Sequence, residues 1–554
     1  MLFSSLFAKT AEYEKLAHAL SAPGACALFG LPGSGRAMAY AALAKETGRF
    51  LCIVTPGEAE ATRFAGDLNA LGIPTAVFPA RDYVLRPIEG TAREYEYRRL
   101  SVLGDIVGGR LQAVCVPDEG LTQYTTPRAE FCNNTRTLHP GDTVPRTELT
   151  ALLYNAGYAR RAQVDGPGQF SIRGDIVDLY APDMKLPVRM EFWGDEIDTM
   201  HTFDLATQRR EDPIEKIYVS PAREVLFGSP AEAAELLRAF IKKFRGKKRT
   251  ALEACLATEL AQLDGGALPV NMDKYLAVRY PQPATLLDYF DDPLLVLEEP
   301  ASLREAERAT TYRRGEEISA LLQDGVLVAG LDNLYAENGY LWAQAANHRT
   351  ICAENFARSM PDIPLKDIVN APAHTLPAWG GEVTSLLEDL QPLCNGGAAV
   401  TVLAGTQRAA AGLAGDLRTK GLLVTTDPDA APGAGLVQVL PGQLSAGCSV
   451  PFAKYALFTA RAFGISSTQK KKKRNKDALN SLSEIAVGDL VVHQNHGIGR
   501  YAGIQRMAVQ GVTKDYLRIE YDKKDVLYVP VTQLDLLSRY TAPGDSDNVK
   551  LSRL

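Results

Sequence analysis

The chain has 554 residues, which at about 150 residues per domain predicts several domains rather than one core. Hydrophobic residues make up 46% and charged residues 23% of the sequence, which excludes a fibrous or wholly disordered chain. The net charge of −6 excludes a protein that binds nucleic acid through its overall charge. No apolar run is long enough to span a membrane, so we expect a soluble cytoplasmic protein.

The first part of the chain alternates apolar runs with segments of helical period. We predict strands at Ala25–Phe29, Phe50–Val54 and Gln112–Val116, and helices at Arg36–Thr47 and Glu58–Leu71. This order predicts a parallel sheet with crossover helices.

The pattern then changes to short strands separated by Asp, Pro and Gly turns, at Phe170–Tyr180, Leu186–Trp193 and Thr199–Asp204. Such spacing predicts an antiparallel meander. A helix at Ala231–Lys243 follows. A second α/β unit is predicted from three strands and one helix, at Ala399–Leu403, Leu422–Thr425, Leu436–Leu440 and Gln407–Thr419.

The last part of the chain contains a polar, lysine-rich segment at 464–483, which predicts a flexible linker. Six of the seven residues Lys470–Lys476 are basic; we interpret this run as solvated, with weak contact to double-stranded DNA as the alternative. Residues 487–535 are rich in Val, Ile and Tyr with regular turns, which predicts a small β-barrel.

A glycine-rich loop, GLPGSGRA at residues 30–37, follows the first predicted strand and opens a helix, where a P-loop would hold phosphates. A working P-loop needs a Lys for the β- and γ-phosphates and a Ser or Thr for Mg²⁺, but Arg36 and Ala37 stand there. We therefore predict a degenerate nucleotide-binding loop made by Gly30, Gly33, Gly35, Arg36 and Ala37.

The acidic element that should accompany a P-loop is LLVLEEP at residues 294–300, in which Glu298 replaces the usual Asp. We interpret Glu298 and Glu299 as a surface-exposed pair at a strand end. Two altered elements together predict a nucleoside-triphosphatase fold without catalysis.

The outward face of the predicted meander is a candidate protein-binding surface. Alternation along a strand puts Arg189 and Trp193 on one side and the apolar residues between them on the other, and Arg173 on a neighbouring strand can join them. Arg and Trp are typical of protein-binding hot spots. The alternative is a Trp packed on a neighbouring domain beside solvated arginines.

In the predicted barrel, His493 and His496 resemble a metal-binding pair, but no third ligand is nearby, so we predict structural histidines and no metal.

The eight cysteines contain no Cys-x-x-Cys pair, which predicts reduced thiols without zinc or disulfides. Within the strand Tyr501–Val509, Ile504, Arg506 and Met507 suit an edge that pairs with a strand of a partner; a covered barrel strand is the alternative.

Three motifs carry a family resemblance. FSIRGDIVDLY (170–180), VRMEFWGDEI (188–197) and LLDYF (286–290) resemble the nucleotide-excision-repair protein UvrB and its relatives. GDLVVHQNHGIGRYAG (488–503), DYLRIEY (515–521) and LYVPV (527–531) are similar to the RNA-polymerase-interacting domain of CarD-type regulators. Both in this order resemble the Mfd family of bacterial transcription-repair coupling factors.

The resemblance implies that Arg173, Arg189 and Trp193 bind UvrA, and that the barrel, through Ile504, Arg506 and Met507, binds the β subunit of RNA polymerase. That family continues into an ATP-driven motor, so we expect an N-terminal, monomeric adaptor portion that holds stalled polymerase and recruits UvrA. ATP, Mg²⁺ and most DNA contact are expected only in the motor, and no cofactor in this chain. The alternatives are a UvrB-type damage-loading ATPase, which Arg36 and Ala37 disfavour, and a CarD-like transcription regulator.

The expected fold class is a multidomain α/β protein, with a degenerate P-loop domain of helicase-like, UvrB-like type, an inserted antiparallel β-rich domain, a second small α/β domain and an SH3/Tudor-like β-barrel. The expected boundaries are 1–134 and 223–349 for the two segments of the P-loop domain, 135–222 for the β-rich UvrA-binding domain, 350–463 for the small α/β domain, 464–483 for the linker, 484–546 for the barrel and 547–554 for the start of a linker to the motor.

Overall fold

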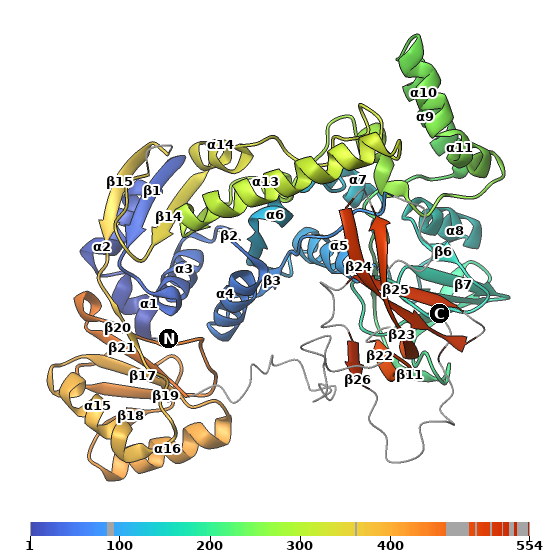
Figure 1. Ribbon diagram of the computed structural model, residues 1–554. Helices are drawn as coiled ribbons and strands as arrows, with labels where there is room; N and C mark the ends of the chain where they lie inside the picture. The colour runs from blue at the N-terminus through green and yellow to red at the C-terminus, as the bar shows by residue number, and fades with distance from the viewer. Residues whose placement is uncertain are drawn as a thin grey trace.

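The computed structural model describes residues 2–85, 93–360, 363–460, 487–493, 496–509, 512–522, 525–530, 537–539 and 552 (Figure 1). The predicted linker 464–483 and its basic run Lys470–Lys476 lie outside the described residues. Within the described part of the chain, no helix is long and apolar enough to cross a membrane.

A seven-stranded, all-parallel sheet forms the first α/β unit. In spatial order its strands are β15 (Leu365–Asn370), β1 (Gly24–Phe29), β14 (Arg349–Glu354), β13 (Leu294–Glu298), β2 (Leu51–Thr55), β4 (Ala113–Pro117) and β3 (Thr75–Val77). Helices cover both faces, so alternate residues of one strand enter different cores: Cys26 packs toward one face and Ala25 toward the other. The predicted parallel sheet is confirmed.

The helices of this unit follow the local sequence. They are α1 (Leu2–Phe7), α2 (Ala11–Ala19), α3 (Gly33–Thr47), α4 (Glu58–Ala70), α5 (Glu94–Val107), α6 (Asp118–Leu121) and α14 (Tyr340–Asn347). Helix α3 ends where Gly48 adopts a left-handed φ of 65°, which glycine takes without a Cβ clash. The 24-residue helix α13 (Pro300–Gln323) runs from this sheet to the opposite end of the molecule (Figure 1).

A six-stranded sheet follows, together with a small two-stranded sheet. The strands of the larger sheet are β11 (Arg210–Pro213), β10 (Glu196–Phe203), β9 (Val188–Trp193), β8 (Ile176–Tyr180), β7 (Gln169–Arg173) and β6 (Ala159–Arg160), and β5 (Arg136–Leu138) pairs with β12 (Ile217–Val219). The meander from β7 to β11 is antiparallel as predicted, but β6 and β7 are parallel, so the sheet is mixed. Helices α7 (Arg128–Asn133) and α8 (Arg146–Asn155) accompany it.

Helices α9 (Pro230–Lys242), α10 (Lys247–Cys255), α11 (Ala257–Asp264) and α12 (Leu276–Arg279) share a separate apolar core with the end of α13.

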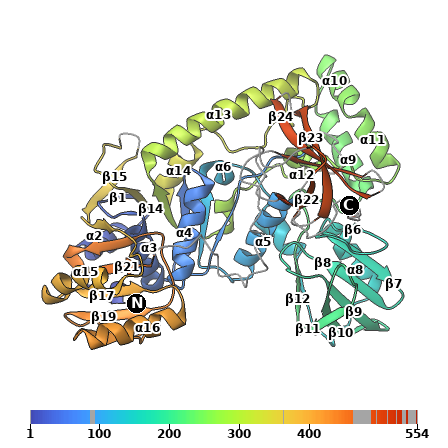
Figure 2. The same ribbon diagram turned by 60° about the horizontal axis from the view of Figure 1, so that its bottom comes forward.

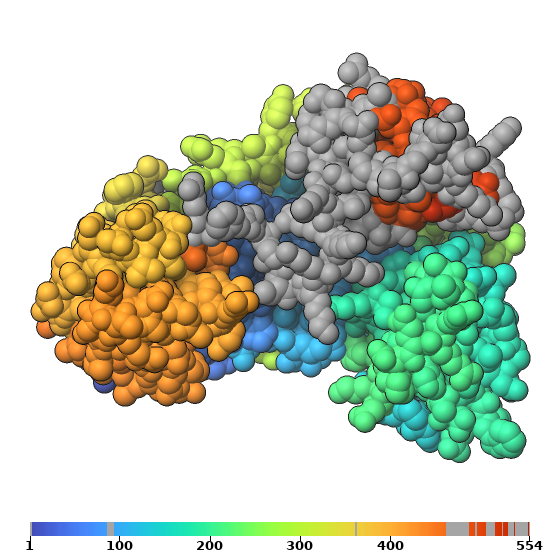
Figure 3. All heavy atoms as spheres, turned by 90° about the horizontal axis from the view of Figure 1, so that it is seen from below, coloured from blue at the N-terminus to red at the C-terminus, as the bar shows by residue number. Residues whose placement is uncertain are grey.

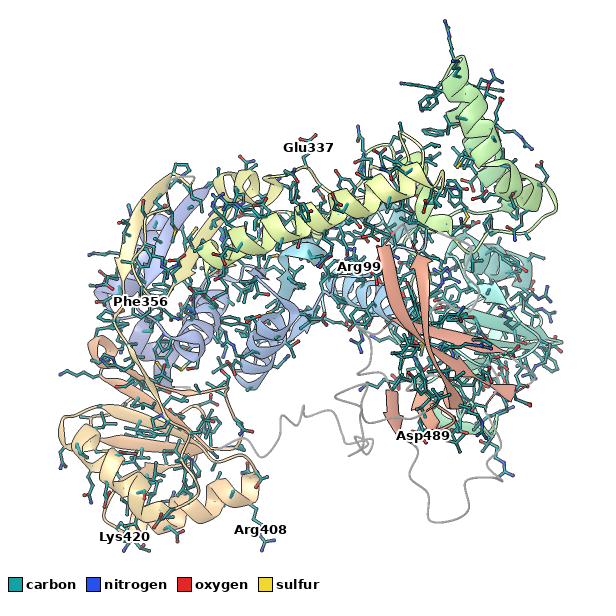
Figure 4. All side chains as sticks on the ribbon, in the orientation of Figure 1. Arg99, Glu337, Phe356, Arg408, Lys420 and Asp489 are labelled. Atoms are coloured by element: carbon teal, nitrogen blue, oxygen red, sulfur yellow. The ribbon has the colours of Figure 1, made fainter. Side chains whose placement is uncertain are left out.

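A buried ion-pair network joins this helical region to the sheets. Arg99 of α5, labelled in Figure 4, is fully buried, and its Nε lies 2.6 Å from Oε1 of Glu224. Arg81 Nη1 lies 2.7 Å from Oδ2 of Asp273. Because charges are buried only when paired, this network fixes α5 against its neighbours.

The second α/β unit has six strands in the order β16 (His374–Leu376), β20 (Gly447–Val450), β21 (Tyr455–Thr459), β17 (Ala399–Leu403), β19 (Leu436–Leu440) and β18 (Leu423–Thr425), with helices α15 (Val383–Asn395) and α16 (Gln407–Thr419). The sequence predicts that this unit begins at residue 350. The structure instead pairs β14 and β15 with strands of the first sheet, so its first strand is β16. Strands paired across long loops carry no local signal of the sheet they join.

The C-terminal sheet is five-stranded and antiparallel, in the order β25 (Val526–Pro530), β24 (Val512–Glu520), β23 (Gly497–Val509), β22 (Leu490–His493) and β26 (Leu537–Arg539). Figures 1 and 2 place it beside α5 and the β-rich sheet. Seen from below, the second α/β unit and the β-rich sheet lie at opposite ends of the molecule (Figure 3).

Candidate functional site

The degenerate P-loop connects β1 to α3, and its Arg36 side chain is directed at the end of β13. Arg36 Nη1 lies 2.9 Å from Oε2 of Glu298, and Nη2 lies 2.9 Å from Oε1 of Glu299. Nη1 also donates to the backbone oxygen of Ala353 at 3.2 Å. The residue in the place of the P-loop lysine is therefore satisfied by acidic groups of the same chain.

This ion pair is buried. Arg36 and Glu298 are only 3% and 2% exposed, and the Tyr40 hydroxyl donates to Oε1 of Glu298 at 2.5 Å. Burial raises the pKa of Glu298, against the opposing effect of Arg36. Burial lowers the pKa of Arg36, but Glu298, Tyr40 and Glu299 together more than offset this effect, so that pKa lies above its usual value. The prediction that Glu298 is surface-exposed is wrong, because Arg36 and Tyr40 cover it.

The second α/β unit packs against the same loop. A Cβ added to Gly35 would lie 3.0 Å from Sγ of Cys448, a residue of β20. On α4, Oδ1 and Oδ2 of Asp67 accept hydrogen bonds from the backbone nitrogen and Oγ of Ser445, at 2.7 and 2.6 Å. The rest of the loop is equally confined: Ala37 is fully buried, a Cβ on Gly33 would lie 2.5 Å from Nη1 of Arg63, and Gly30 has a φ of 91°.

A second cluster lies on the outward face of the β-rich sheet and centres on Asp178 of β8. Arg189 holds this carboxylate with a two-pronged contact, Nε to Oδ1 at 2.7 Å and Nη2 to Oδ2 at 2.9 Å. Arg173 Nη2 reaches Oδ2 from the other side at 2.5 Å. Asp178 is fully buried, so two cations surround one desolvated carboxylate and are held in fixed positions.

The three predicted face residues differ in exposure. The side chain of Arg189 is 12% exposed and lies over the ring of Phe203, that of Arg173 is 47% exposed, and Trp193 is 84% exposed. The predicted alternation is confirmed, since Val188, Met190 and Phe192 are buried. Sequence reasoning missed Asp178; its position opposite Arg189 in the β8–β9 pair is the signal that identifies it.

The predicted edge strand is an inner strand of the C-terminal sheet, because β23 pairs with both β22 and β24, so the edge assignment is wrong for the strand as a whole. Pairing with β22 covers Gly497–Arg500, and Tyr501 exchanges backbone hydrogen bonds with Gly488 and Asp489 just before β22, whereas pairing with β24 extends to Val509. Ile504 is 48% exposed. Arg506 and Met507 lie in β23, and their side chains fall outside what the structure describes.

The third cluster joins the C-terminal sheet to α5. Nε2 of His496 and Nε2 of His493 lie 3.4 and 3.7 Å from Oε1 of Glu94, the first residue of α5. Burial lowers the pKa of His493 to about 4, so its imidazole is neutral at pH 7. The expectation that no third ligand lies near the two histidines is wrong, because Glu94 lies beside them in the folded chain. Glu94 is some four hundred residues away in sequence, so the sequence pattern did not reveal it.

Two family models match parts of the chain. A "UvrB interaction domain" matches residues 137–225, which include Arg173, Asp178, Arg189 and Trp193. A "CarD-like/TRCF RID domain" matches residues 485–541, which include β22 to β26.

The curated proteins that are similar to this chain include three factors that share one name. A transcription-repair-coupling factor of Bacillus subtilis is 28% identical over 543 residues, covering 95% of this chain and 46% of the relative. Those of Staphylococcus haemolyticus and Staphylococcus aureus are 27% and 26% identical over 86% of this chain and 41% of their own lengths. The chain spans less than half the length of these relatives.

Proposed function

We propose that this chain, a relative of the transcription-repair-coupling factors, is an adaptor in transcription-coupled DNA repair that binds UvrA through its β-rich sheet and RNA polymerase through its C-terminal sheet. The presence of both matched domains in one chain supports this proposal most directly. A stand-alone regulator would need only the second, and a damage-loading ATPase would need a functional P-loop.

Three residues carry UvrA binding in this proposal: Arg173 and Trp193 at the surface and Arg189 behind them. An exposed Trp contributes a large contact area, and the exposed guanidinium of Arg173 is already oriented by Asp178. Arg189 is largely buried, so it acts mainly by holding Asp178 and with it Arg173. We assign Trp193 and Arg173 to direct contact.

The RNA-polymerase surface is the part of β23 beyond Tyr501, with Ile504, Arg506 and Met507 as the residues that select the partner. Since the described residues of β22, and Gly488 and Asp489 before it, pair with β23 only as far as Tyr501, the backbone that follows suits addition of a strand from the polymerase β subunit. In this proposal the five strands close into an SH3/Tudor-like barrel.

The first α/β unit serves as a scaffold with the helicase-like, UvrB-like fold and without nucleotide chemistry. Arg36 occupies the place of the phosphate-binding lysine and is neutralised by Glu298 and Glu299. We propose that ATP, Mg²⁺ and displacement of the polymerase belong to a motor outside this chain. The chain itself acts as a monomer in the bacterial cytoplasm.

Co-purification tests the adaptor role. RNA polymerase immobilised on resin should retain UvrA only when this chain is added, because each partner binds a different surface. If the chain binds polymerase but never UvrA, the regulator role replaces the adaptor role. Binding of neither partner would leave the proposal without support.

A further inference from the structure

The cluster of Glu94, His493 and His496 has the composition and spacing of a metal site. Its three donor atoms all lie within 4.8 Å of one another. Bonds of about 2.1 Å in a tetrahedral zinc site place neighbouring donor atoms about 3.4 Å apart. The separations of 3.4 and 3.7 Å from Oε1 of Glu94 to the two imidazole nitrogens match that spacing.

We propose that Glu94, His493 and His496 bind a divalent transition-metal ion of the zinc type, which joins the C-terminal sheet to α5. Two imidazoles and one carboxylate form a ligand set that zinc commonly uses, with a fourth position left for water. The side chain of His496 is 33% exposed, so this position is reached from solvent.

The surroundings favour a metal over a simple ion pair. His493 is fully buried, and its Nε2 lies 3.7 Å from Oε1 of Glu94, which is longer than an ordinary hydrogen bond. Oε2 of Glu94 is buried and accepts no hydrogen bond from the described residues, and the buried hydroxyl of Tyr521 likewise has no hydrogen-bond partner among them. A buried carboxylate with an oxygen that accepts no hydrogen bond is costly unless a cation compensates its charge.

The position of the site gives the metal a structural consequence. Glu94 begins α5, which the buried Arg99 fixes in the first α/β unit, whereas His493 ends β22 of the sheet that carries β23. Asp489, labelled in Figure 4, lies just before β22. A metal here couples the orientation of the C-terminal sheet to the rest of the chain.

Metal titration of the untagged chain, first dialysed against a chelator, tests the proposal. Zn²⁺ should bind with one-to-one stoichiometry by calorimetry. Glu94→Gln and His496→Ala should each weaken binding by about tenfold or more, since even loss of an outer partner of a ligand costs about 10- to 100-fold. His139→Ala is the matched control, because His139 forms an exposed pair with Asp142.

Cobalt distinguishes this site from the free cysteines. Bound Co²⁺ should give visible d–d absorption without the near-ultraviolet charge-transfer band of thiolate ligands, and Glu94→Gln should remove that absorption. Circular dichroism checks that the variants are folded. Binding that is absent in the wild-type chain, unchanged in both ligand variants, or accompanied by a thiolate band would overturn the proposal.

Discussion

Arg36 and Glu298 form a buried ion pair, with Nη1 and Oε2 2.9 Å apart, at the place where a P-loop ATPase would hold its phosphates and metal. The two residues come from the loop after β1 and from the end of β13. Tyr40 completes the contact by donating to the other oxygen of Glu298. The position of the phosphates is thus occupied by a buried ion pair of the chain itself.

Loss of Arg36 should therefore cost stability. Arg36→Ala leaves Glu298 buried without its cation, and we expect the free energy of unfolding to fall by about 3–5 kcal/mol. Chemical denaturation measures this. Arg49→Ala is the matched control, because its pair with Asp292 is exposed and should contribute about 0–1 kcal/mol. Equal effects of the two variants would show that the Arg36 pair is unimportant.

The same geometry predicts that the chain neither binds ATP tightly nor hydrolyses it. Arg36→Lys combined with Ala37→Thr should not restore hydrolysis, since Glu298 and Glu299 remain altered. Phosphate release and binding of a fluorescent ATP analogue are the measurements. Hydrolysis by the wild-type chain that disappears in Arg36→Ala would contradict the prediction.

Asp118, which follows β4, should make stability depend on pH. Burial, together with the negative charge of Glu307, raises its pKa to about 7, and its Oδ1 accepts no hydrogen bond from the described residues. The unfolded carboxyl loses its proton near pH 4, so between about pH 4 and 7 the folded state binds more protons and stability falls as pH rises.

Asp118→Asn removes this titration while keeping the shape of the side chain. The variant should gain stability over the wild type as pH rises from 4 to 8, by up to about 4 kcal/mol for a shift of about three pH units. Denaturation curves across that range provide the test. A difference that does not change with pH would show that Asp118 is ionised normally in the folded chain.

Much of the local structure follows from the sequence. Helix α16 spans the predicted Gln407–Thr419, and the end of α3 at Gly48 follows from the ability of glycine to take a positive φ. The outward position of Trp193 follows from strand alternation alone. These features depend on neighbours within a few residues.

The predictions that the structure contradicts concern contacts between residues far apart in the sequence. Glu298 ends a strand and has the composition of a surface site, yet Arg36, 262 positions earlier, buries it. The approach of Glu94 to His493 and the joining of β14 to the first sheet depend equally on tertiary packing. Periodicity describes one element at a time and contains no information on which elements meet.

The two partner surfaces should be separable. Met507→Arg puts a charge where we expect an apolar anchor on β23, so polymerase binding should fall by about tenfold or more while UvrA binding is unchanged. Titration of the full chain against each partner measures both. Equal polymerase affinity of the wild type and Met507→Arg would remove β23 from the proposed interface.

Trp193→Ala should weaken binding of UvrA and leave binding of RNA polymerase unchanged. Trp193 is 84% exposed, so its loss should leave the free energy of unfolding almost unchanged, yet UvrA binding should weaken by about 1–4 kcal/mol. Arg173→Ala and Arg189→Ala should each weaken UvrA binding within the same range, but Arg189→Ala should also destabilise the fold because it leaves Asp178 buried with one cation fewer. Tyr312→Ala, an exposed aromatic on α13, is the control.

The most direct test of the adaptor role is the amount of UvrA retained by immobilised RNA polymerase in the presence of wild-type chain, Trp193→Ala or Tyr312→Ala. We expect all three chains to bind the polymerase equally, and only Trp193→Ala to fail to bring UvrA with it. Retention of UvrA by Trp193→Ala at the wild-type level would contradict the assignment of the Arg/Trp face. Retention of UvrA by the resin without any chain would contradict the adaptor role itself.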